Sequence, residues 1–186
     1  MRTLSKARLP SESSDAVGLV VALLVRFPEI ATIVSHPTDG TLTLAFAIDA
    51  RIDRRTELET REGVSEHVRS LLDVVGERAD CLTVVCEADE STSFVRVTRD
   101  ARSFSREELQ MIVALLCDRF GATLLRSPAA DDDAFDDEAS ADELVEFAIE
   151  ALRDPAQQRS LVGFREEKRV LVYFVKRKKA KARGRS

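Results

Sequence analysis

Hydrophobic and polar positions recur along this chain with two different periods. Apolar residues at three- and four-residue spacing predict helices at residues 15–26, 53–75 and 105–120. Ser105 and Glu108 have the spacing of a capping box, which marks the start of the third helix, and Gly121 is placed to end it. Leu23 lies outside the main apolar stripe of the first helix, so we expect that helix to be covered on two sides.

A period of two predicts strands between the helices. In residues 41–49, bulky apolar side chains alternate with threonine and alanine, which indicates a sheet with one buried and one polar face. The Asp39-Gly40 turn joins this strand to residues 30–35 as a hairpin. A second hairpin is predicted at 81–87 and 92–99, and a fifth strand at 122–126.

The predicted order of elements over residues 15–126 is α-β-β-α-β-β-α-β. It predicts an α+β fold, with an antiparallel-rich sheet of about four to five strands and helices mainly on one face. A C-terminal helix-strand extension follows, with a capping box at Ser140 and Glu143, and with residues 161–164 paired to 169–175. The expected units are a flexible N-terminal arm (1–14), the α+β core domain (15–126), an acidic linker (127–139), the helix-strand extension (140–175) and a basic tail (176–186).

Composition narrows the classes of protein. The three scattered cysteines favour a reducing compartment, so we expect a cytoplasmic protein, and their spacing is unlike that of zinc ligands. The apolar run Val17–Val25 is too short to span a bilayer, which takes about 20 residues, and we interpret it as a buried helix. Seven dispersed glycines form no phosphate-binding loop, so no cofactor is predicted.

Charge is segregated along the chain. The net charge is −5, and since the last eleven residues carry seven positive charges, residues 1–175 carry −12. Such a tail attracts polyanions through phosphate contacts that release counterions. It could instead solubilise the chain or pair with the acidic segment 131–150. The candidate nucleic-acid-binding residues are Lys176, Arg177, Lys178, Lys179, Lys181, Arg183 and Arg185.

Two further groups of residues could carry chemistry. The polar sheet face, with its threonines, Phe94 and Arg96, could receive RNA, form a subunit interface or face solvent. The carboxylates of Asp49, Glu87 and Asp89 would emerge near one sheet edge if their strands run parallel, and they could then hold Mg²⁺.

The sequence therefore predicts a non-catalytic binding protein. Its basic tail contacts RNA or the ribosome, and its α+β core engages a protein partner or a second copy of the chain. One alternative is a protein–protein adaptor or homo-oligomer with no role in nucleic-acid binding. The other is a metal-dependent phosphate-processing enzyme that uses the three carboxylates Asp49, Glu87 and Asp89.

Overall fold

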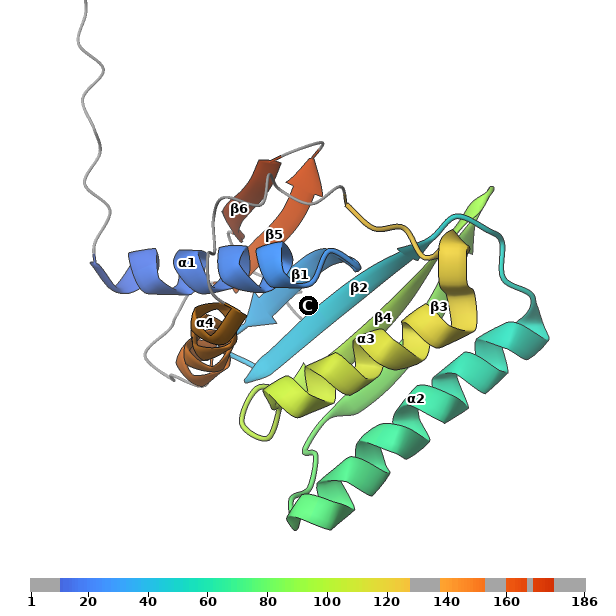
Figure 1. Ribbon diagram of the computed structural model, residues 1–186, viewed down its shortest axis with the longest axis horizontal. Coiled ribbons are helices and arrows are strands. Elements are labelled where there is room, and N and C mark those ends of the chain that lie inside the picture. Colours follow the sequence, from blue (N-terminus) through green and yellow to red (C-terminus); the bar gives the residue numbers. More distant parts are fainter. Residues whose placement is uncertain (1–10, 128–137, 153–159, 167–168, 176–186) are drawn as a thin grey trace, which may run out of the picture.

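The computed structural model describes residues 11–127, 138–152, 160–166 and 169–175 (Figure 1). The helices are α1 (Ser11–Arg26), α2 (Arg54–Val75), α3 (Arg106–Phe120) and α4 (Glu138–Leu152), with a short 3₁₀ helix η1 (Gly121–Thr123). The strands are β1 (Ile30–His36), β2 (Thr41–Ile48), β3 (Leu82–Asp89), β4 (Thr92–Asp100), β5 (Ser160–Glu166) and β6 (Arg169–Val175). No helix in these ranges is long and apolar enough to cross a membrane.

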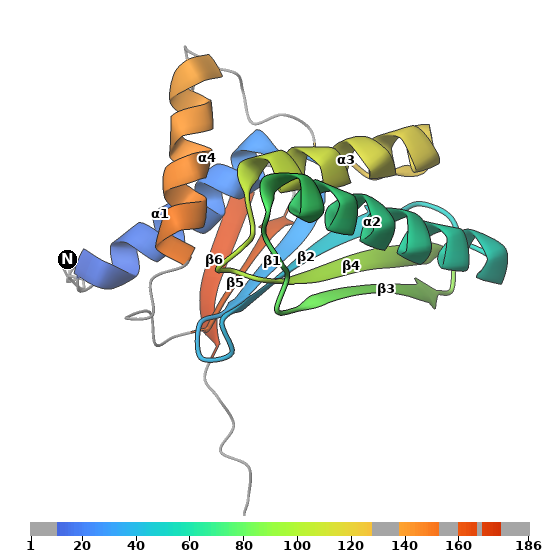
Figure 2. The same cartoon turned by 90° about the horizontal axis from the view of Figure 1, so that it is seen from below.

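The strands form one sheet in the order β3-β4-β2-β1-β5-β6, and every neighbouring pair is antiparallel. Figure 2 shows the four helices on one side of this sheet. The predicted α+β class, with an antiparallel sheet and helices on one face, is confirmed. The sheet has six strands rather than four to five, because β5 pairs with β1 and extends the sheet beyond the first hairpin.

The predicted starts and ends of α2 and α3 follow from their capping residues. The Asp53 carboxylate accepts a hydrogen bond from the Thr56 amide at 2.7 Å, and the Ser105 hydroxyl accepts one from the Glu108 amide at 3.2 Å. Gly76 ends α2 with φ of +74°, a left-handed conformation that glycine adopts without steric cost. Both hairpins also lie where the alternation places them.

The fifth strand predicted at residues 122–126 is wrong. The chain forms η1 there, and one isolated bridge pairs Leu124 with Ile48. Because β1 begins opposite Phe46, only the last two residues of β2 have an unpaired side, which leaves room for a bridge and not for a strand.

Two helix starts also differ from the prediction. Helix α1 begins at Ser11, so residues 11–14 belong to a helix and only residues 1–10 of the expected arm lie outside the described ranges. Helix α4 begins at Glu138, which places Ser140 inside the helix rather than at its cap. In both cases a run of polar residues with adequate helix propensity extends the helix beyond its apolar stripe.

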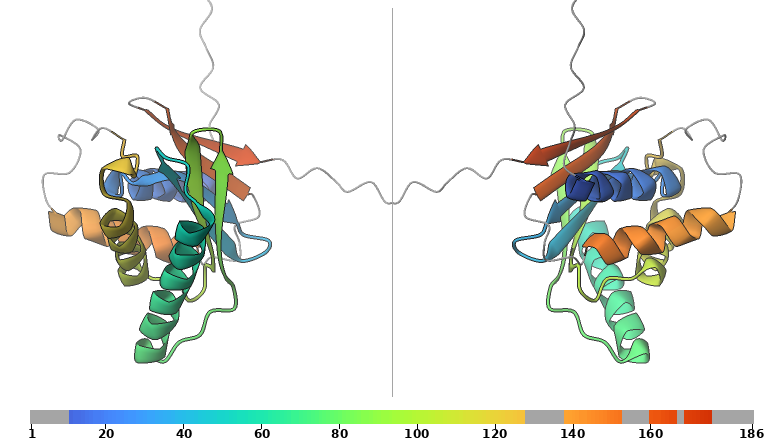
Figure 3. Two further views of the ribbon diagram at one scale, coloured as in Figure 1. Left: turned by 90° about the vertical axis from the view of Figure 1, so that its right-hand side faces the viewer. Right: turned by 90° about the vertical axis from the view of Figure 1, so that its left-hand side faces the viewer.

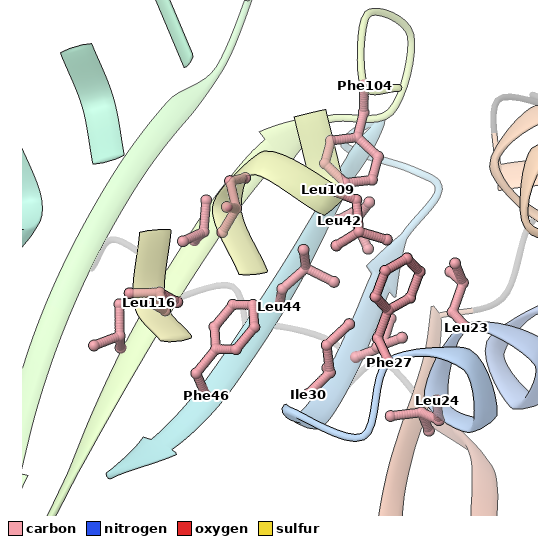
Figure 4. Close-up of a cluster of buried hydrophobic side chains, with 14 of the residues drawn as sticks. Leu23, Leu24, Phe27, Ile30, Leu42, Leu44, Phe46, Phe104, Leu109 and Leu116 are labelled. Atoms are coloured by element: carbon pink, nitrogen blue, oxygen red, sulfur yellow. The ribbon is translucent and has the colours of Figure 1, made fainter. Parts of the chain in front are cut away.

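The core lies between the sheet and the helices. Leu42, Leu44 and Phe46 of β2 point toward Leu109 and Leu116 of α3, and all five side chains are buried (Figure 4). Burying each side chain of this size contributes about 1.5–3 kcal/mol. The alternation in residues 41–49 therefore correctly assigned the buried face of the sheet.

Helix α1 joins the C-terminal extension to this core. A Cβ atom at Gly163 of β5 would overlap Val20 Cγ1 and would lie 3.1 Å from Leu24 Cδ1, so the missing side chain lets α1 cross directly over β5. On its other side α1 packs against α4, whose Val145 and Ala148 are buried, and Figure 3 shows the two helices side by side. The expectation that α1 is covered on two sides is confirmed.

Candidate functional site

The face of the sheet opposite the helices, called here the outer face, is not covered by any described helix (Figure 2). Strand register identifies its residues, because their neighbours along each strand are the buried core positions. Across the sheet from β3 to β6 they include Thr83, Val85, Glu87, Asp89, Phe94, Arg96, Thr98, Thr43, Ala45, Ala47, Thr32, Val34, Val162, Phe164, Glu166, Arg169, Leu171, Tyr173 and Val175.

The β3–β4 end of the outer face is polar, and its arginine is paired with a glutamate. Thr43 and Thr98 lie opposite each other on paired strands and share a hydrogen bond of 2.9 Å between their hydroxyls. The Arg96 guanidinium forms an ion pair with Glu87 and lies 5.7 Å from the centre of the Phe94 ring. The prediction that Phe94, Arg96 and the threonines share one face is confirmed, but this arginine is already paired with Glu87.

The β5–β6 end of the outer face is apolar. Phe164 stacks on Tyr173 with ring centroids 5.7 Å apart and an angle of 16° between the planes. Leu171 and Val162 flank this pair on the same face. Tyr173 remains 54% exposed and Val175 47% exposed, so the end of β6 presents large apolar side chains to solvent.

The two outermost strands, β3 and β6, differ in how their free edges are protected. Strand β3 ends in Glu87 and Asp89, and α2 packs alongside it, with Cys86 Sγ 4.0 Å from the Glu57 carbonyl oxygen. Strand β6 contains no charged residue from Val170 to Val175. Natural sheets usually protect edges with charged side chains, prolines or bulges. Strand β6 has such a charge only at its start, in Arg169, and α1 packs against it as α2 packs against β3.

The seven predicted tail residues lie outside the described ranges. The tail follows Val175 directly, so the basic segment begins where the apolar edge strand ends. The acidic segment is described only in α4, where Asp142 pairs with Arg106 at 3.1 Å and with Arg26 at 3.5 Å. Glu143, Glu146 and Glu150 are exposed on the same helix.

The three carboxylates of the enzyme alternative are not brought together. Strands β2 and β3 do run in the same direction, but β4 lies between them and Glu87 pairs with Arg96. Within the part of the chain that the structure describes, no three His, Cys, Asp or Glu side chains are close enough to hold one metal ion. We therefore do not propose a shared metal site at Asp49, Glu87 and Asp89.

A buried ion-pair network, which the sequence did not lead us to expect, ties the end of β4 to α3. Arg99 Nε donates to Glu108 Oε1 at 2.5 Å and Nη2 donates to Oε2 at 2.9 Å. Nη2 also donates to Ser103 Oγ, and Nη1 donates to the Cys81 carbonyl and to Asp100. Arg99 and Glu108 are almost completely buried, with 1% and 0% exposure.

Hydrogen bonds within the protein, rather than water, stabilise the charged groups of this network. Burial would raise the pKa of Asp100, but hydrogen bonds from Ser103 and from the Cys81 amide, with the charge of Arg99, lower it to about 2. Burial raises the pKa of Glu108, and its hydrogen bonds to Arg99 act in the opposite direction. All five guanidinium donors of Arg99 have acceptors, so no donor remains for a ligand and the network is structural.

The sequence did contain a signal for this network. Arg99 lies two residues after Val97 in a strand whose inward positions are Val95 and Val97, so the alternation directs its side chain into the core. An arginine at such a position needs a buried carboxylate partner, and Glu108 is nearby in sequence.

Comparison of this chain with models of known protein families, with curated proteins and with solved structures finds no match.

Proposed function

We propose that this chain is a non-catalytic binding protein with two working parts. The β5–β6 end of the core associates with a second copy of the chain. The basic tail contacts a polyanion, and we propose that this polyanion is RNA. One observation carries the proposal: the tail follows Val175, directly at the end of an edge strand whose last six residues are apolar.

We assign polyanion binding to the tail because the outer face has few cations that could contact a phosphate backbone. Arg96, the arginine at its β3–β4 end, is paired with Glu87, and residues 1–175 together carry −12. Up to seven tail cations can each neutralise a phosphate, which for a single strand predicts a slope of log K against log salt of up to about −5. Contacts of this kind position a protein on RNA without reading its sequence.

Self-association is assigned to the β5–β6 end because apolar surface gathers there. Tyr173 and Val175 are both about half exposed, and Phe164 adds an aromatic face next to them. A second copy offers the same neutral, apolar surface in return, as in a symmetric interface between identical patches.

Binding of a single-stranded RNA tests the tail. We expect the full chain to bind with strong salt dependence between 50 and 200 mM KCl, measured by fluorescence anisotropy. A chain without residues 176–186 should lose most of that affinity. A chain whose tail keeps its composition in shuffled order is the matched control, and it should bind as well as the original because the contacts are to phosphates.

Equal binding by the full and the tail-deleted chains would refute the RNA part of the proposal. Replacing Glu143, Glu146 and Glu150 of α4 by glutamine addresses the intramolecular alternative. If the tail were sequestered on α4, these changes would raise RNA affinity at least tenfold. We expect a change of less than threefold, because salt screens the attraction between exposed charges.

A further inference from the structure

We draw no further inference here: the strongest candidate, the cleft between the start of α3 and α4, is lined chiefly by the carboxylates of Glu107, Glu143, Glu146 and Glu150, and nothing else in the part of the chain that the structure describes points to a ligand there.

Discussion

Replacing Asp100 by asparagine tests whether the buried network stabilises the fold through charge. Asp100 Oδ1 accepts hydrogen bonds from Arg99 and from the Cys81 amide, and Oδ2 accepts two from Ser103, through its amide and its hydroxyl. The residue is 5% exposed, so water cannot replace these partners. Asparagine keeps the shape of the side chain but removes the negative charge and one of the two acceptor oxygens.

The size of the effect follows from the pKa of Asp100, which lies at about 2 instead of 3.8 in the folded chain. A shift of this size corresponds to about 2 kcal/mol of stability at neutral pH. Because the pKa is lowered by folding, this stability is fully present well above pH 4. It is lost as the pH falls toward 2, where the folded state also takes up the proton.

Urea unfolding of the original chain and of Asp100→Asn at several pH values measures this difference. We expect the variant to be less stable by about 2 kcal/mol at pH 6 and by about half that at pH 3, because the protonated aspartate resembles asparagine. Asp39→Asn is the control, since Asp39 is exposed in the β1–β2 turn, and it should change stability by less than about 0.5 kcal/mol. A difference that stays constant between pH 6 and pH 3 would show that packing rather than charge accounts for the loss.

Two further substitutions, each with a matched control, test local features of the fold. Gly163→Ala should destabilise the chain by about 1–3 kcal/mol in urea unfolding, because the added Cβ meets Val20 of α1. Gly18→Ala, at an exposed helical position with nothing within 4 Å, should instead stabilise it by about 0.5–1 kcal/mol, and equal effects at the two sites would contradict the close approach of α1 to β5. Ser105→Ala should cost about 1 kcal/mol through loss of the α3 cap, whereas Ser70→Ala in the exposed middle of α2 should be nearly neutral.

Local signals in the sequence were sufficient to predict the first part of the fold. Helices α2 and α3 begin at capping residues, Asp53 and Ser105, whose hydrogen bonds involve neighbours three residues away. The alternation in β2 identifies its buried face because the period of a strand is two. Interactions of this range are encoded within a short window of sequence, so they can be recognised without knowledge of the rest of the chain.

Pairing between distant segments could not be predicted in the same way. Strand β5 joins the sheet beside β1, about 130 residues earlier in sequence, as Thr32 opposite Phe164 shows. Nothing in either strand alone specifies its neighbour. Gly163 does contribute, because only a residue without a side chain leaves room for α1 over β5, but the sequence does not show which helix lies there.

The outer face illustrates the same limit for the candidate site. Phe94 and Arg96 were correctly placed on one face by alternation within β4. Phe164 and Tyr173 share that face only because β5 and β6 extend the sheet, and the stacking of their rings depends on the register between these two strands. The strand order therefore places the apolar part of the outer face next to the edge strand β6.

The charge of the body limits what the tail can bind. A tail of seven cations on a body that carries −12 gains phosphate contacts but brings a repelling body with it, so the chain should bind RNA weakly at physiological salt. Its affinity for a single-stranded RNA should fall steeply between 50 and 200 mM KCl, because each phosphate contact of the tail releases counterions. An affinity that is the same at both salt concentrations would show that contacts other than those of the cations carry the binding.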